Sequence, residues 1–212
     1  MAPRTGTERA PKKGEVRRQK IIDVATRLFS RAGFHHASIA DIADEVGITQ
    51  AGVLYHFPNK PAILFAVLQD REMRNETRAE TFGTDYLTGF VETLRQNETS
   101  PVLVQLFAVM SSESVFEDHP AHDFFVRRYD RLVRIITEAL EPALDPARLV
   151  PGMSPETIAR LFIAAADGLR QQWLLDRDAV DRPATMELLI NILRPYLKDA
   201  ATGTPTTRHA AQ

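Results

Sequence analysis

Apolar side chains recur at intervals of three and four residues along almost the whole chain, from Val16 to Leu197. This spacing places them on one face of an α-helix, and the strict alternation of apolar and polar residues that marks a half-buried strand occurs nowhere in the sequence. Clusters of Pro, Gly and Asp separate the periodic segments. The sequence therefore predicts an all-α fold of about nine helices.

Four helices are predicted in the first part of the chain, over residues 16–32, 38–46, 49–57 and 59–79. Ser38 and Thr49 are placed as N-caps of the second and third helices, because a side-chain oxygen there can accept an orphan backbone N–H. Gly33 and Gly47 stand where a glycine commonly ends a helix. Pro58 blocks continuation of the third helix.

Five longer helices are predicted to follow, over residues 85–96, 101–116, 120–140, 155–176 and 183–197. Four of them have Pro near the start, where its missing N–H costs nothing. Residues 1–14 and 199–212 mix Pro, Gly, Thr and charge without periodicity, and we expect both to be disordered. The predicted organisation is a basic arm at 1–14, a small helical domain at 15–60, a larger helical domain at 61–198 and a tail at 199–212.

The formal net charge of -2 hides a change of sign along the chain. Up to Lys60 there are ten basic and six acidic residues, which gives +4, and the remaining 16 basic and 22 acidic residues give -6. A basic N-terminal module on an acidic body suits binding of a polyanion at one end, although a solvated basic tail explains the charge equally well.

Composition also narrows the class of protein. The chain contains 0 Cys, which excludes disulfides, thiolate metal sites and cysteine nucleophiles. No apolar run approaches the roughly 20 residues of a membrane span. The first residues carry positive charge without an apolar stretch behind it, so we expect no signal peptide and a cytoplasmic location.

The most informative stretch runs from Ser38 to Phe57. Two short helices are joined there by a tight turn at Gly47, and Ile48 can fill the core between them. This arrangement predicts a helix-turn-helix.

The second of these helices opens with small and polar residues, so its backbone can enter the major groove of DNA. Gln50 can pair with adenine, Ala51 can lie against a thymine methyl, and Gly52 permits close approach. Tyr55, His56 and Lys60 follow at spacings that suit contact with phosphates.

The segment IADIADEVGITQAGVLYHFPNKPAILFAVL resembles the DNA-binding signature of the TetR family of repressors, and RRQKIIDVATRLFSRAGF before it resembles the family's first helix. The resemblance covers residues 16–68, and the helical plan extends it over nearly the whole chain. It implies a homodimer through the last two helices, an inducer pocket among the middle helices, and release of a repressor from a palindromic operator. By position, it implies DNA contacts at Ser38, Thr49, Gln50, Gly52, Leu54, Tyr55, His56 and Lys60.

Two positions depart from the family pattern. Ala40 stands where many members have a basic base-reading side chain, and Leu54 where many have a phosphate-binding Tyr. Tyr55 and His56 are expected to take over the second task. The basic residues between Arg9 and Lys20 are expected to add affinity through the backbone or the minor groove.

Large apolar side chains line the predicted helices of the second domain, and sequence alone does not separate core from ligand pocket. The candidates for contact with a largely apolar inducer are Phe107, Met110, Tyr129, Asp167, Arg170 and Trp173. Asp167 and Arg170 interrupt an otherwise apolar helix, and their spacing lets them pair with each other, contact a partner subunit or orient a ligand.

Small residues in the same helix permit close approach of a second helix across a two-fold axis. The expected dimer face combines Ala164, Ala165, Ala166 and Gly168 with the stripe Met186, Leu189, Ile190, Leu193 and Leu197, and packing within one chain is the alternative.

His119 and His122, with the carboxylates of Glu117, Asp118 and Asp123, suggest a second class of protein, an all-α enzyme or metal-binding protein. Capping or exposure to solvent is the more usual role at a helix start. Because no nucleophile–base pair, phosphate-binding Gly loop or HExxH spacing is present, we expect no enzyme, no cofactor and no metal.

Overall fold

The computed structural model describes residues 13–79 and 86–198. Within these ranges it contains nine α-helices and one short 3-10 helix, and the only extended pairing there is an isolated bridge between Leu144 and Leu197. The predicted all-α fold is confirmed. Most of the expected arm at 1–14, and all of the tail at 199–212, lie outside the described residues.

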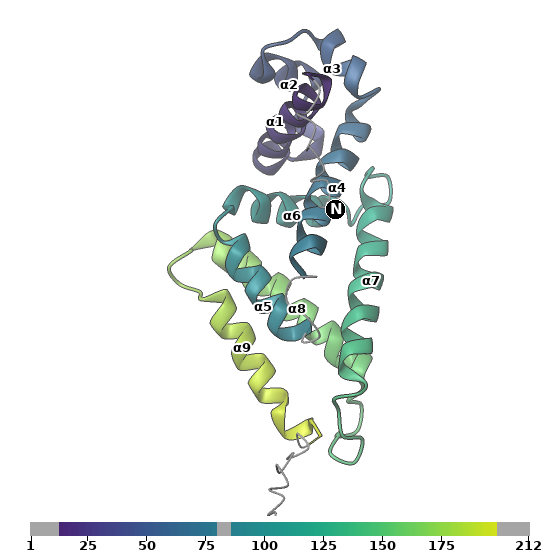
Figure 1. Ribbon diagram of the computed structural model, residues 1–212, viewed down its shortest axis with the longest axis vertical. Helices are drawn as coiled ribbons and strands as arrows, with labels where there is room; N and C mark the ends of the chain where they lie inside the picture. Colours follow the sequence, from purple (N-terminus) through teal and green to yellow (C-terminus); the bar gives the residue numbers. More distant parts are fainter. Residues whose placement is uncertain (1–12, 80–85, 199–212) are drawn as a thin grey trace, which may run out of the picture.

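Three helices form a head at one end of the molecule (Figure 1): α1 (Lys13–His36), α2 (Ile39–Val46) and α3 (Gln50–His56). α1 begins three residues before the expected Val16, because Lys, Glu and Arg continue a helix readily. Gly33 breaks α1 as expected, with φ 75° and ψ 175°, and one further turn carries the chain to His36.

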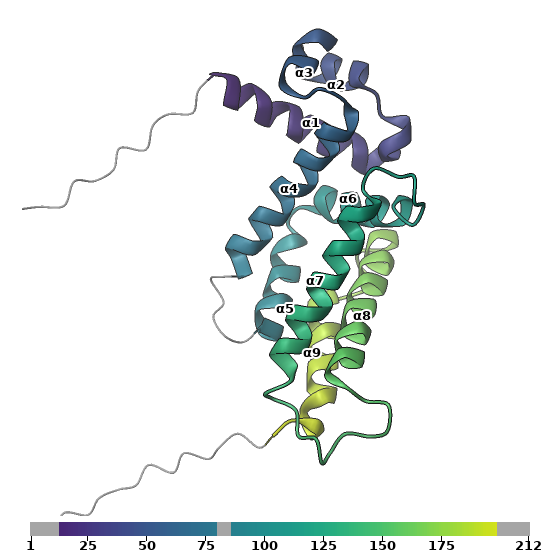
Figure 2. The ribbon, with the colours of Figure 1, turned by 90° about the vertical axis from the view of Figure 1, so that its right-hand side faces the viewer.

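α4 (Lys60–Ala79) begins in the head and runs toward the rest of the molecule (Figure 2). Its residues Ile63, Leu64 and Leu68 are fully buried in a core that includes Phe29 of α1. The same cluster contains Leu106, Phe107 and Met110 from α6 (Pro101–Glu113). Apolar packing is thus continuous across residue 60, and the domain boundary expected there stays a prediction.

The body of the molecule consists of α5 (Tyr86–Asn97), α6, α7 (His122–Leu140), α8 (Pro155–Leu175) and α9 (Arg182–Leu193). α7 packs along α8, and α5 packs along α9 (Figures 1 and 2). A second buried cluster lies between them, built on Ile136, Leu140, Ile158, Phe162 and Met186.

Three helix ends in the body differ from the expected positions by two residues or more. α6 stops at Glu113 instead of residue 116, and α7 begins at His122 instead of Pro120, because a turn occupies the residues between them. α9 ends at Leu193, and a 3-10 helix spans Arg194–Tyr196. Pro195 accounts for this end, since its ring excludes it from the interior of an α-helix.

Candidate DNA-binding interface

The start of α2 is fixed by a reciprocal pair of hydrogen bonds. The Asp41 N–H donates to Ser38 Oγ at 3.1 Å, and the Ser38 N–H donates to Asp41 Oδ2 at 2.9 Å. These bonds form a capping box, and the hydrogen bonds from Ser38 lower the pKa of Asp41. The start of α2 is therefore set at Ser38, as the sequence predicts, by two residues three positions apart.

The turn between α2 and α3 depends on Gly47, which is left-handed at φ 78° and ψ 43°. Its N–H donates to Ala43 O at 2.9 Å, and Ile48 packs against the core beside it. Thr49 Oγ1 then accepts the Gly52 N–H at 3.1 Å. The predicted helix-turn-helix geometry is confirmed.

α3 buries only Val53 against the head, and its other side faces outward. Gln50, Ala51 and Leu54 are exposed, and Tyr55 is 86% exposed, which is unusual for an aromatic side chain. His56 is half-buried, with its ring in edge contact with Tyr55. Six residues at the start and along the outer side of α3 form one outward face, which we call the reading face: Thr49, Gln50, Ala51, Gly52, Leu54 and Tyr55.

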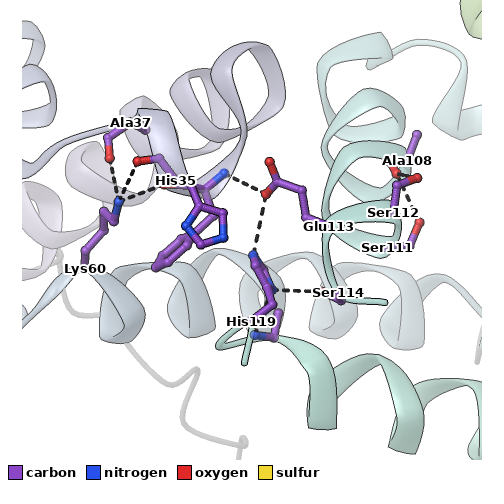
Figure 3. A network of polar contacts seen from close by, with 11 residues as sticks. His35, Ala37, Lys60, Ala108, Ser111, Ser112, Glu113, Ser114 and His119 are labelled. Atoms are coloured by element: carbon purple, nitrogen blue, oxygen red, sulfur yellow. Dashed lines mark hydrogen bonds and ion pairs between the residues drawn. The ribbon is translucent and has the colours of Figure 1, made fainter. Parts of the chain in front are cut away.

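Lys60 lies in a different environment from the reading face. Its Nζ donates to the carbonyl oxygens of Phe34 at 2.8 Å, His35 at 3.3 Å and Ala37 at 2.9 Å (Figure 3). Burial lowers the pKa of Lys60, although the charge of Glu113 opposes that shift. The ammonium thus holds the residues between the break at Gly33 and the start of α2, which we call the linker (residues 33–37). The expected phosphate contact of Lys60 stays a prediction, as do the other DNA contacts.

Glu113, the last residue of α6, joins the body to this linker (Figure 3). Its Oε2 accepts the Phe34 N–H at 2.8 Å. The carboxylate occupies the space beside Gly33 where a Cβ would lie, so a side chain at that position would overlap it. The linker residues 33–37 are therefore held from two sides, by the α6 carboxylate and by the α4 ammonium of Lys60.

His119 completes this junction. It is buried, so the expected exposure to solvent is wrong, while the capping role is borne out by the Ala121 N–H, which donates to Nδ1 at 3.2 Å. Nδ1 is thus an acceptor, and the proton of the neutral ring lies on Nε2, 3.5 Å from Glu113 Oε2. Burial lowers the pKa of His119.

His122 serves the same turn, and its Nδ1 lies 2.9 Å from the Ser114 carbonyl oxygen. Among the described residues, no group of three or more His, Asp or Glu side chains could hold a metal ion. In the same part of the chain, no helix is long and apolar enough to cross a membrane.

The candidate ligand residues occupy three places. Phe107 and Met110 are buried in the core shared with the head. Asp167 accepts a hydrogen bond from Tyr129 Oη at 2.6 Å, and its other oxygen lies 3.1 Å from Arg170 NH1, so the expected pairing of Asp167 with Arg170 is confirmed. Trp173 packs separately, under the guanidinium groups of Arg177 and Arg182.

Sequence reasoning missed two residues that now stand out. Glu113 was not singled out, because its partner Phe34 is 79 positions away in the chain. Arg182 was not singled out either, since an Arg before a Pro at a helix start usually lies in solvent; it is only 3% exposed. Neither position carries a local signal of its contacts.

Comparison with known families decides what this arrangement is. The model of the tetR family of bacterial regulatory proteins matches residues 21–67, and that of the BetI-type transcriptional repressor C-terminal domain matches residues 84–199. The chain belongs to the TetR family. It is a helix-turn-helix transcriptional regulator, and the family resemblance of the sequence is confirmed.

Relatives of this TetR-family regulator agree along most of its length. The HTH-type transcriptional regulator SrpR of Pseudomonas putida is 27% identical over 180 residues, which cover 84% of this chain and 82% of SrpR. The crystal structure of NalD, the secondary repressor of the MexAB-OprM multidrug efflux pump in Pseudomonas aeruginosa, has a TM-score of 0.69 at 22% identity and covers 90% of this chain and 100% of NalD.

A third similar structure is a transcriptional regulator from Saccharomonospora viridis in complex with choline, with a TM-score of 0.67 at 24% identity over 85% of this chain and 97% of that one. At these identities the two solved structures establish the shared fold.

Proposed function

We propose that this TetR-family regulator is a homodimeric repressor that binds a palindromic operator and leaves it when a small molecule enters the helical body. The observation that carries the proposal is the reading face. It holds a glutamine and an 86% exposed tyrosine on a short helix whose opposite side is anchored by Val53. Exposed aromatic and amide groups of this kind bind base edges and phosphates.

Gly52 supports the same role. A Cβ on Gly52 would lie 3.4 Å from Thr49 Oγ1 and 3.5 Å from Ile48, which a small local adjustment accommodates. Since its backbone is also not left-handed, the fold of this chain gives little reason for glycine there. Close approach of an outside surface, such as the floor of the major groove, supplies the reason.

Dimer formation through α8 and α9 is the second part of the proposal, with a corrected set of residues. Met186 and Leu193 of the expected stripe are buried in their own chain, so they do not face a partner. The exposed apolar residues on these helices are Leu161 at 63%, Leu175 at 79%, Leu188 at 58% and Ile192 at 57%. Such a face suits an isologous contact between two copies, which places two reading heads on one duplex.

The junction at Glu113 supports release by a ligand. α6 carries Phe107 and Met110, which pack in the core shared with the head, and its last residue holds the linker that leads into α2. A ligand that binds better to a body with α6 displaced would shift the heads away from operator spacing. The similar protein from Saccharomonospora viridis was crystallised in complex with choline, which supports binding of a small molecule by this chain. In this proposal the chain binds DNA and a small molecule and catalyses no reaction. Its location is the cytoplasm.

The DNA-binding part is tested with a matched pair of variants. Gln50→Ala removes an exposed amide from the reading face, and Gln69→Ala removes an exposed amide from α4. Fluorescence anisotropy with operator DNA should show that Gln50→Ala weakens binding about tenfold or more, while Gln69→Ala binds like the wild type. Equal affinity for all three proteins would contradict the reading face.

The dimer is tested in the same way on the body. Leu188→Arg places a charge on the exposed face of α9, and Val126→Arg places one on the outer side of α7, where Val126 is 47% exposed. Sedimentation equilibrium should give monomers for Leu188→Arg and dimers for Val126→Arg. A dimer that survives Leu188→Arg would place the interface elsewhere.

A further inference from the structure

Arg182, the first residue of α9, is the most deeply enclosed cation of the body. Its side chain is 3% exposed, and its guanidinium lies 5.3 Å from the centre of the Trp173 ring. Its Nε and NH1 are buried and have no hydrogen-bond partner among the described residues. A buried guanidinium with unmet N–H groups is costly, so a native chain keeps one only where something satisfies it.

The nearest carboxylate does not satisfy Arg182. Glu98, just beyond the end of α5, approaches NH1 with Oε1 at 4.0 Å, which is an ion-pair distance and too long for a hydrogen bond. The same Oε1 also lacks a hydrogen-bond partner within the described part of the chain. The Glu98 side chain is 28% exposed, so it borders solvent.

Arg170 adds a second donor to this region. Its NH1 lies 3.1 Å from Asp167 Oδ1, but its Nε is buried without a hydrogen-bond partner in the residues described. Asp167 offers little more, because its other oxygen already accepts the Tyr129 hydroxyl at 2.6 Å. Arg170 precedes Trp173 by three residues on α8, so the two side chains leave the same side of the helix, and Arg182 lies over that Trp173 ring. Burial lowers the pKa of Arg182; the charge of Glu98 opposes this shift, and the charge of Arg170 adds to it.

We infer that Arg182 and Arg170 form a binding site for an oxyanion, the carboxylate of a small organic acid, between the C-terminal half of α8, the start of α9 and Glu98. A carboxylate accepts paired N–H groups from guanidinium, and among the described residues the Nε of both side chains and NH1 of Arg182 have no acceptor. The inference rests on the proposed ligand response and names the ligand class, and the expectation of a largely apolar inducer stays a prediction.

A cationic ligand is disfavoured at the same place. Quaternary ammonium groups are bound by open aromatic faces. The Trp173 ring already carries the guanidinium groups of Arg177 at 5.1 Å and Arg182 at 5.3 Å. An added cation would face both charges, whereas an anion would be attracted to them.

Trp173 makes the site directly observable, because it is the only tryptophan of the chain. Its fluorescence is recorded on DNA-free wild-type dimer, excited at the red edge of its absorption, during titration with four probes: sodium benzoate, benzamide, inorganic phosphate and tetramethylammonium chloride. Benzoate should give a saturable change, and its neutral isostere benzamide and tetramethylammonium should give none. Saturation by phosphate with no tighter binding of benzoate would identify a free inorganic oxyanion as the occupant instead.

Three variants separate the site from a merely structural ion pair. Arg182→Met should weaken benzoate binding about tenfold or more. Glu98→Gln should tighten it several-fold, because it removes the carboxylate that is ion-paired with Arg182 and keeps the side-chain size. Arg160→Met is the matched control, since Arg160 lies on the exposed side of α8 and pairs with Glu156, and it should leave the titration unchanged.

The outcomes overturn or sustain the inference independently of the repressor proposal. It is overturned if neither anion changes Trp173 fluorescence saturably in the wild type or in Glu98→Gln, or if benzamide acts as well as benzoate. Benzoate binding that leaves the operator complex intact would keep the site and reject the proposed release. A neutral compound that releases the operator while anions fail to bind would keep the release and reject the site.

Discussion

The head and the body of this regulator satisfy their polar groups in different ways. In the head, helix ends are closed by neighbours in sequence, such as Ser38 with Asp41 and Thr49 with Gly52. In the body, α8 begins with a cap of the same kind, Ser154 with Thr157, but buried polar groups also join distant segments: Tyr129 meets Asp167 across 38 positions. Several body donors, including those of Arg182, have no partner among the described residues.

On the proposed function, the head has to keep one shape and the body has to respond to a ligand. Local caps suit the head to present the same reading face with and without ligand, as recognition of DNA requires. A body with unmet donors would gain stability from a ligand that supplies the missing acceptor. Between them, the linker residues 33–37 belong to both parts, which makes the junction the most sensitive place to test.

The largest effect on stability is expected from Gly33→Ala. Its φ of 75° and ψ of 175° suit glycine almost exclusively, and its Cβ would overlap the Glu113 carboxylate. Urea denaturation should show a loss of about 3 kcal/mol, from backbone strain and the displaced carboxylate together.

Two glycine controls make this test specific for the junction. Gly47→Ala meets no atom within 4 Å of its Cβ and should cost only the left-handed strain at φ 78°, about 1 kcal/mol. Gly14→Ala in α1 also meets no atom within 4 Å and should not destabilise the protein. Equal losses at Gly33 and Gly47 would mean that the Glu113 contact contributes nothing.

The next effect has the opposite sign. Arg182→Met removes a buried cation whose N–H groups are unmet, and Glu98 can turn to solvent, so we expect the ligand-free protein to gain about 1 kcal/mol. Thermal and urea unfolding of the dimer at equal protein concentration measure it. A clear loss of stability would show that the pair with Glu98 is structural, and the contrast between head and body would fail.

Thr49→Ala should lower the free energy of unfolding by a similar amount. It removes the acceptor of the Gly52 N–H, a loss of about 1 kcal/mol for an N-cap. Thr49→Ser keeps the acceptor and serves as the control. If both variants unfolded at the wild-type urea concentration, the caps would not be what stabilises the head.

The smallest effect concerns pH. Burial lowers the pKa of His119 below its ordinary value of 6.5, so the unfolded chain takes up this proton before the folded chain does as the pH falls. The stability that the neutral His119 ring contributes is fully present above pH 6.5, and it is lost as the pH falls through the lower pKa of the folded state. His119→Gln should therefore flatten the fall in urea midpoint between about pH 7 and pH 5, and parallel profiles would argue against a buried neutral His119.

Sequence and structure agree where the determining contacts are local. The helix-turn-helix was predictable from Ser38, Gly47 and Thr49, because each acts on residues within four positions. Lys60 illustrates the limit. Its place after α3 predicts a phosphate contact, but its ammonium lies on carbonyls 23 to 26 positions earlier, which no local pattern reveals.

α9 shows a second limit. Apolar residues occur on both of its sides, so periodicity did not indicate which side faces the core. Met186 is buried in the chain, whereas Leu188 and Ile192 face outward. Only the position of α5 and α8 decides between them, and that position is a property of the whole fold.

The central claim is that the reading face of a dimer recognises an operator. Selection of bound duplexes from a random DNA pool by the purified wild-type protein, followed by titration of the selected duplex with salt, tests it most directly. We expect the wild-type protein to select a palindromic duplex and to bind it with an affinity that falls steeply as the salt concentration rises. Gln50→Ala should not enrich that palindrome. Enrichment of no sequence above the non-specific background would contradict it.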